Sequence, residues 1–334
     1  MKIAFFSAQP YERPIFRDTL EQCSHLGCTI DYFETRLTKD TAVLAKGYPI
    51  VCPFVCDDLS AAVIDHLWQH GTRLLTLRSA GFNHVDLERC REVGMRVTRV
   101  PAYSPYAVAE HTVCLLLALN RKIHRAYQRV KELNFSLTGL VGFDIHGKVV
   151  GVVGTGKIGR AFTRIMCGFG AEVLAYDPFP SEELGSIPGV RYVPLDQLCE
   201  RSDIISLHCP LTPESHHMLN ADRLARMRPR VIILNTSRGG LIDTRALISA
   251  LKSGAIGAAG LDVYEEEDGI FFSDLSEAGL QDDILARLLT FPNVLVTAHQ
   301  GFLTREALSN IAHRTLSNVE RFISKSLDSE TCLV

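Results

Sequence analysis

The feature that most constrains the fold is a glycine-rich turn near the middle of the chain, Gly154-Thr-Gly-Lys-Ile-Gly159. Residues 149–153 before it are small and β-branched apolar residues, typical of a buried parallel strand. Residues 157–162 after it continue in a helical pattern. In such a unit the first glycine permits a tight turn, the second lets the backbone approach a pyrophosphate, and the third allows helix and strand to pack closely. The pattern therefore predicts a dinucleotide site at a helix N-terminus, with a tight turn that binds nothing as the alternative.

An acidic residue follows the next predicted strand, about 20 residues further on, where a carboxylate meets an adenosine ribose. This residue is Asp177, and Pro178 and Phe179 come after it rather than Arg or Lys. Because a carboxylate repels a 2′-phosphate, we expect NAD rather than NADP.

Length and composition indicate an ordinary globular protein of two domains. The chain has 334 residues, of which 46% are hydrophobic and 22% charged. A net charge of -3 gives no electrostatic reason to bind nucleic acid or an anionic membrane. No apolar run reaches the length of a membrane span, and the N-terminus is unlike a signal peptide. We therefore expect a cytoplasmic protein.

The ten cysteines are dispersed along the chain. Cys52 and Cys56 have no second pair with zinc-ligand spacing, so we expect no metal site. Cys114, Cys167 and Cys209 lie in apolar runs, where a thiol behaves as a small hydrophobic group. We interpret the cysteines as reduced core residues of a cytoplasmic protein.

Short apolar strands alternate with amphipathic helical patterns on both sides of residue 101, which predicts two doubly wound parallel sheets. The expected strands are 3–7, 29–33, 50–55, 74–77 and 97–100, then 149–153, 173–176, 204–207, 231–235, 258–262 and 294–297. The expected helices are 16–26, 59–70, 85–93, 195–200, 221–227, 244–252 and 304–325.

One long helix is expected over residues 106–130, begun by Ser104 as a possible N-cap and Pro105 at the first helical position. It is apolar nearly all round between Val108 and Leu119. A helix of this kind must be buried between domains or between subunits, so we place the domain crossing near residue 101.

Three groups suited to hydride-transfer chemistry follow predicted strands, and ligands gather at the carboxyl ends of parallel strands. Arg238 follows one strand and could hold a carboxylate in two-pronged geometry. His299 follows another and could give a proton to a developing alkoxide. A carboxylate beside His299, from Glu265, Glu266 or Glu267, could favour the protonated form of the imidazole. The alternatives are a surface arginine, a structural histidine and a solvated acidic loop.

At these motifs the chain resembles the D-isomer-specific 2-hydroxyacid dehydrogenases, and within them the bacterial D-lactate dehydrogenase subgroup. The motifs that carry the resemblance are Gly154-Thr-Gly-Lys-Ile-Gly159, Leu207-His-Cys-Pro-Leu-Thr-Pro213, Asn235-Thr-Ser-Arg-Gly-Gly240, Gly260-Leu-Asp-Val-Tyr264, His299-Gln300, Arg78-Ser-Ala-Gly-Phe-Asn-His-Val-Asp86 and Val100-Pro-Ala-Tyr-Ser-Pro105. They span essentially the whole chain.

The resemblance implies a catalytic triad of Arg238, Glu267 and His299, and it selects Glu267 from the three glutamates. It implies substrate contacts at Ser79, Ala80, Gly81, Tyr103 and Phe302. The positions that match cofactor contacts, together with the outer glycines of the turn, are Gly154, Thr155, Gly156, Lys157, Ile158, Gly159, Asp177, Cys209, Pro210, Thr236 and Asp262.

By the same resemblance we expect a flavodoxin-like substrate domain, residues 1–100 and 300–334, and a Rossmann NAD-binding domain, residues 101–299. We expect a homo-oligomer, a tetramer or a dimer, with the helix after Ser104 at a subunit interface. The expected reaction is NADH-dependent reduction of pyruvate, a small 2-keto acid, to D-lactate. A dehydrogenase of a bulkier D-2-hydroxy acid and an NADH-sensing binding protein on the same fold are the alternatives.

Overall fold

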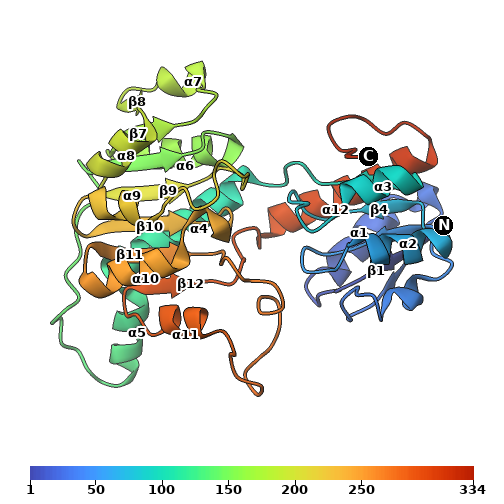
Figure 1. The fold of residues 1–334 in the computed structure, drawn as a ribbon, viewed down its shortest axis with the longest axis horizontal. Helices are drawn as coiled ribbons and strands as arrows, with labels where there is room; N and C mark the ends of the chain where they lie inside the picture. Colours follow the sequence, from blue (N-terminus) through green and yellow to red (C-terminus); the bar gives the residue numbers. More distant parts are fainter. The chain divides into compact units, whose positions relative to one another are not determined.

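The computed structural model describes residues 1–334, which divide into two α/β units (Figure 1). Unit 1 comprises Met1–Ser104 and Leu303–Val334. Unit 2 comprises Pro105–Phe302. Each unit is built on its own parallel sheet, so the predicted fold class of two doubly wound domains is confirmed.

Unit 1 has a five-stranded sheet in the order β2-β1-β3-β4-β5, the flavodoxin-like order. Its strands are β1 (Lys2–Phe5), β2 (Thr29–Tyr32), β3 (Ile50–Cys52), β4 (Leu74–Thr76) and β5 (Arg96–Thr98). Its helices are α1 (Arg13–Gln22), α2 (Ala61–Gln69), α3 (Leu87–Val93) and α12 (Arg305–Ile323), with 3-10 turns η1 (Ser24–Leu26) and η2 (Ala42–Ala45). The C-terminal helix α12 contacts α1 and β4, and the Asn318 amide donates to the carbonyl of Arg99 at 2.9 Å.

Unit 2 has a seven-stranded sheet in the order β12-β11-β10-β9-β6-β7-β8. Its strands are β6 (Val149–Val153), β7 (Glu172–Tyr176), β8 (Val190–Tyr192), β9 (Ile204–Leu207), β10 (Val231–Asn235), β11 (Ile256–Leu261) and β12 (Val294–Val296). Its helices are α4 (Pro105–Arg121), α5 (Ile123–Lys131), α6 (Lys157–Gly168), α7 (Glu182–Gly185), α8 (Leu195–Arg201), α9 (Ala221–Arg226), α10 (Thr244–Ser253) and α11 (Asp283–Leu289), with the 3-10 turn η3 (Gly239–Leu241). The strand order reverses between β6 and β9, the point at which doubly wound sheets bind nucleotides.

The prediction of one long helix after Ser104 is wrong in one respect. The helix breaks at Lys122, which has a left-handed φ of 52°. The break falls where the buried face ends. Helix α4 buries Leu115, Leu116 and Leu119, whereas α5 buries no residue. A helix that leaves its packing surface no longer gains from continuing in the same direction, so the chain turns away at this point.

The prediction that Cys114 is a core residue is also wrong for the single chain. Cys114 is exposed on α4, and Cys167 and Cys209 are half-buried. The fully buried thiols are Cys52, Cys90 and Cys199. An apolar neighbourhood in sequence does not say which side of a helix the sheet covers.

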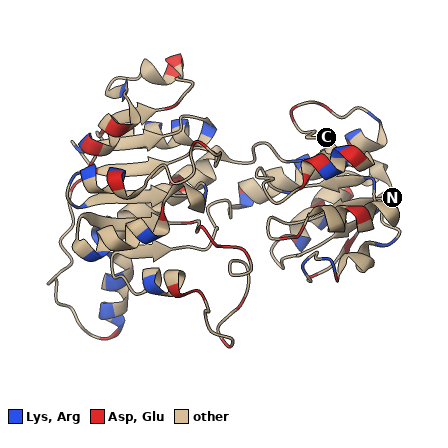
Figure 2. Cartoon of the chain, in the orientation of Figure 1, with Lys and Arg blue, Asp and Glu red and all other residues tan.

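Short elements account for the other differences. Strand β8 and helices α7 and α11, which have three to seven residues, have no predicted counterpart. Strand β3 ends at Cys52, before the predicted end at residue 55. None of the helices combines the length and apolarity that a membrane span requires. Charged residues of both signs are interspersed over both units (Figure 2).

Candidate active site

The glycine turn after β6 has the geometry that its sequence predicts. Gly154 has a left-handed φ of 91°, and a Cβ on Gly159 would lie 2.0 Å from the Gly154 carbonyl oxygen. A Cβ on Gly156 would meet nothing within 4 Å, so the backbone there faces open space. Helix α6 begins immediately afterwards at Lys157, and no side chain caps its first amides. These amides and the open approach fit a dinucleotide pyrophosphate.

Asp177, directly after β7, is held against this turn. Its Oδ2 accepts hydrogen bonds from the amide of Thr155 at 2.6 Å and the hydroxyl of Thr155 at 3.0 Å. Its Oδ1 accepts from the amide of Phe179 at 2.8 Å, and the hydroxyl of Tyr192 donates to Thr155 at 2.9 Å. The carboxylate is therefore fixed beside the glycine turn, as a group that binds ribose hydroxyls must be.

The other predicted cofactor positions follow β9, β10 and β11 at the carboxyl edge of the same sheet. The Ser237 hydroxyl donates to the Cys209 carbonyl at 2.5 Å and so joins two of these loops. Thr236 is buried, and its hydroxyl lies 2.8 Å from that of Thr112 on α4. Burial raises the pKa of Cys209 to about 11, so its thiol stays protonated near neutral pH. Pro210, next to it, is exposed.

Glu267 and His299 form a hydrogen-bonded pair. Nδ1 of His299 lies 2.9 Å from Oε1 of Glu267, and the two side chains are 23% and 29% exposed. Because a carboxylate can only accept, Nδ1 carries the proton in this contact, and Nε2 remains to exchange one with a ligand. Oε2 of Glu267 accepts from the amide of Tyr264 at 3.1 Å. The Phe272 ring lies 5.9 Å from the imidazole, which is therefore oriented from two sides.

The backbone at the histidine is strained. Ala298 has a φ of 50° and His299 a φ of 60°, two successive left-handed residues that are not glycine. Such conformations persist only where the surroundings impose them, and they cluster at functional sites.

Asp262, at the end of β11, imposes this turn. It is 2% exposed, and its carboxylate accepts hydrogen bonds from the amide of Gln300 at 2.8 Å, the amide of Gly301 at 2.8 Å and the hydroxyl of Thr297 at 2.6 Å. Burial alone would raise the pKa of Asp262, but hydrogen bonds from His111 and Thr297 outweigh burial and lower it. Asp262 therefore acts as a buried anion that shapes the turn carrying His299.

Arg238 lies in the loop after β10. Its Nη1 donates to the Ser237 carbonyl at 2.6 Å, and the Asn235 amide donates to the Arg238 carbonyl at 2.8 Å. No hydrogen bond or ion pair joins Arg238 to Glu267 or His299. The two loops do touch through their backbones, because a Cβ on Gly239 would lie 2.1 Å from the carbonyl carbon of Tyr264.

Of the predicted substrate residues of unit 1, Ser79, Ala80 and Gly81 lie in the loop after β4 and Tyr103 follows β5. The Ser79 hydroxyl donates to the Gly81 carbonyl at 2.8 Å, and Arg99 donates to the Ala80 carbonyl at 3.3 Å. The Tyr103 carbonyl accepts from Asn310 of α12 at 2.6 Å. The fifth predicted substrate residue, Phe302, is half-buried and ends unit 2.

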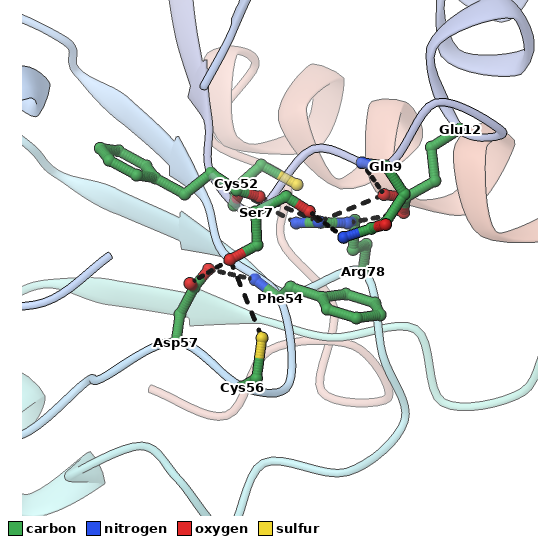
Figure 3. A network of polar contacts seen from close by, with 9 residues as sticks. Ser7, Gln9, Glu12, Cys52, Phe54, Cys56, Asp57 and Arg78 are labelled. Atoms are coloured by element: carbon green, nitrogen blue, oxygen red, sulfur yellow. Dashed lines mark hydrogen bonds and ion pairs between the residues drawn. The ribbon is translucent and has the colours of Figure 1, made fainter. Parts of the chain in front are cut away.

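A buried ion pair that sequence reasoning missed lies directly before this loop (Figure 3). Arg78 is fully buried and pairs with Glu12 at 2.8 Å. Its guanidinium also donates to the carbonyls of Phe6 at 2.9 Å, Ser7 at 3.0 Å and Cys52 at 3.2 Å. Arg78 thus ties together the ends of β1, β3 and β4 beneath the loop at Ser79. The signal in the sequence was a lone arginine closing an apolar strand.

Comparison with known proteins identifies the family. The family model for the NAD binding domain of D-isomer specific 2-hydroxyacid dehydrogenases matches residues 113–301 of this chain. The chain is 49% identical to the D-lactate dehydrogenase of Escherichia coli over 332 residues, 99% of this chain and 98% of the other. A solved structure described as the pyruvate reductase of Chlamydomonas reinhardtii superposes with a TM-score of 0.92 at 44% identity, over 98% of this chain and 97% of that one.

A D-lactate dehydrogenase from Aquifex aeolicus, solved with NAD and lactic acid, superposes with a TM-score of 0.87 at 33% identity over 99% of both chains. The chain therefore belongs to the D-isomer specific 2-hydroxyacid dehydrogenase family. It is an oxidoreductase with an NAD-binding domain, and the predictions of family and cofactor are confirmed.

Proposed function

We propose that the chain is an NAD-dependent D-lactate dehydrogenase that reduces pyruvate to D-lactate. The observation that carries this proposal is the Glu267–His299 pair, which leaves Nε2 of a carboxylate-supported imidazole to act on a carbonyl oxygen. The similarity to D-lactate dehydrogenases and to a pyruvate reductase supports pyruvate as the substrate. Reduction of pyruvate regenerates oxidised cofactor, which is the role of such a reaction in fermentation.

Each member of the triad has a distinct task. Bound NADH supplies the hydride. His299 gives a proton from Nε2 to the alkoxide that develops from the keto group, and Glu267 stabilises the charged imidazole through Nδ1. Arg238 holds the substrate carboxylate with its two-pronged guanidinium. The keto oxygen of the substrate then faces His299, and its carboxylate faces Arg238.

The proposed ligand contacts fall into two sets, one for the cofactor and one for the substrate. In unit 2 the glycine turn from Gly154 to Gly159 and Asp177 hold the pyrophosphate and ribose of the cofactor. Further cofactor contacts come from Cys209, Pro210, Thr236 and Asp262. The backbone of Ser79, Ala80 and Gly81, with Tyr103 nearby, would bind the substrate carboxylate. Phe302 would contact the substrate side chain.

The same proposal includes a homo-oligomer in the cytoplasm. Cys114 on α4 is exposed, as are the apolar side chains of Ile123, Tyr127 and Val130 on α5. A second copy would cover this apolar surface. Ten free cysteines suit a reducing compartment.

The test compares NADH oxidation with pyruvate and with phenylpyruvate. We expect the higher kcat/KM with pyruvate and D-lactate as the product. A higher value with phenylpyruvate would reassign the enzyme to a bulkier D-2-hydroxy acid. Tight NADH binding with no turnover of either acid would favour a sensor of NADH.

A further inference from the structure

Two adjacent histidines and a glutamate meet beside the catalytic loops of unit 2. His216 and His217 precede a segment that pairs with the Arg238 loop, where the His217 amide donates to the Gly240 carbonyl at 2.8 Å. Glu265 comes from the loop after β11, 48 residues away from His217. None of the three belongs to the proposed catalytic triad.

Their side chains converge. Nε2 of His217 contacts Oε1 of Glu265 directly, and the two imidazole rings stack with centroids 3.9 Å apart. One donor atom from each of the three side chains lies within 4.8 Å of the others. Oε2 of Glu265 also accepts from the Thr244 hydroxyl at 3.0 Å. A ligating carboxylate that is itself held by a hydrogen bond is typical of metal centres.

We propose that His216, His217 and Glu265 form a site for a divalent transition-metal ion of the zinc class, and that metal binding there lowers turnover. Two imidazoles and a carboxylate are a known zinc ligand set, with a fourth position left for water. Magnesium and calcium prefer oxygen ligands alone, so this donor set selects against them. His216 is exposed and His217 and Glu265 are half-buried, which gives an ion a path to the donors.

The expectation of no metal site rested on the spacing of the cysteines. The histidine pair has no metal-binding spacing of its own, and its third ligand arrives only through the fold. A search along the sequence cannot detect such a site.

The effect on turnover follows from the position of Glu265. Ligands of a tetrahedral zinc ion lie about 3.3 Å apart, so an ion must part His217 from Glu265, which now touch. Glu265 is two residues from Glu267, and the Tyr264 amide donates to Glu267 at 3.1 Å. Moving Glu265 therefore disturbs the carboxylate that supports His299. This last step depends on the proposed function, whereas the binding step does not.

Binding is tested on the chelator-treated full chain without substrate. Zn²⁺ is titrated in competition with a chromophoric zinc indicator, and Co²⁺ is followed by its visible absorption. We expect one ion per chain. H217A should abolish binding, and the exposed H216A should weaken it by at least about tenfold, the loss that removal of even an outer-shell partner causes. H25A is the matched control, because exposed His25 also pairs with a glutamate, Glu320, at 2.9 Å, and it should bind like the wild type.

Inhibition is tested by NADH oxidation with and without Zn²⁺, each variant being compared with its own metal-free rate. We expect Zn²⁺ to lower the wild-type rate and EDTA to restore it. Zn²⁺ should lower the rate of H216A much less. The proposal is overturned if no ion binds, if H216A and H217A bind as tightly as H25A, or if bound Zn²⁺ leaves the wild-type rate unchanged. An enzyme inactive with every 2-keto acid would refute the proposed function, while the cobalt spectrum would still decide the site.

Discussion

Nδ1 of His299 and Oε1 of Glu267 lie 2.9 Å apart although 32 residues separate them along the chain. The contact brings a loop that follows β11 to a turn that follows β12, two adjacent strands of one parallel sheet. It fixes which nitrogen of the imidazole faces the protein. The proton chemistry of the proposed reaction rests on this relationship.

Replacing Glu267 with Gln should move the pH profile of pyruvate reduction toward lower pH. The carboxylate stabilises the imidazolium, and reduction needs the protonated imidazole as donor, so without the negative charge the donor loses its proton at a lower pH. The rate is measured from pH 5 to 9 at saturating NADH. E266Q, at the exposed neighbouring glutamate, should keep the wild-type profile. An unaltered profile in E267Q would remove Glu267 from this role.

Replacing Asp177 with Ala should weaken the preference for NADH over NADPH. The substitution removes a charge-assisted contact to the ribose of NADH, which contributes about 1.5–3 kcal/mol. It also removes the carboxylate that repels the 2′-phosphate of NADPH. The ratio of kcat/KM for NADPH to that for NADH should therefore rise by about tenfold or more. Glu172, an acid at the opposite end of β7, provides the control E172Q. Equal ratios in D177A and E172Q would contradict the assignment of Asp177.

His208 should make the protein less stable in acid. Its ring hydrogen-bonds Ser206 at 2.9 Å, and although the residue keeps some solvent exposure, burial lowers its pKa from 6.5 to about 3. Native His208 therefore stays neutral where an unfolded histidine binds a proton. The contribution of His208 to the free energy of unfolding is complete above pH 6.5 and is lost as the pH falls toward 3. Within this window the free energy of unfolding falls by on the order of 1 kcal/mol per pH unit. H208Q, which can keep the bond to Ser206, should flatten this dependence in urea unfolding followed by circular dichroism. Parallel curves for the two proteins would exclude His208 as the cause.

Removing one partner of the buried pair should destabilise unit 1. E12Q leaves the fully buried guanidinium of Arg78 without its carboxylate, which costs about 3–5 kcal/mol in comparable pairs. Trp68 is the only tryptophan and lies in α2 of unit 1, so its fluorescence follows the unfolding of this unit in urea. E34Q, which breaks the exposed pair with Arg13, is the control and should unfold like the wild type. Similar midpoints for E12Q and E34Q would contradict a stabilising role for the pair.

The sequence predicted the sheets well because buried parallel strands are continuous apolar runs. It predicted the glycine turn because each glycine has a steric reason visible in the local pattern. Strand-end positions also pointed to Arg238 and His299. The choice of Glu267 from three glutamates came from family resemblance, since periodicity does not distinguish them.

What the sequence could not predict depends on contacts between distant segments. The break at Lys122 reflects where α4 leaves the core, which a helical pattern does not contain. The Arg78–Glu12 pair and the His217–Glu265 contact join residues 66 and 48 positions apart. The local sequence shows a lone arginine after an apolar strand at Arg78, but it does not show which residue pairs with Arg78 or with His217.

The most direct measurement is NADH oxidation with pyruvate, followed by chiral analysis of the lactate, for the wild type and H299A. The proposed mechanism predicts D-lactate from the wild type and a rate lower by about 10²–10⁴-fold in H299A, with NADH affinity retained. H313A, at an exposed histidine of α12, should match the wild type. L-lactate as the product, or undiminished turnover in H299A, would contradict it.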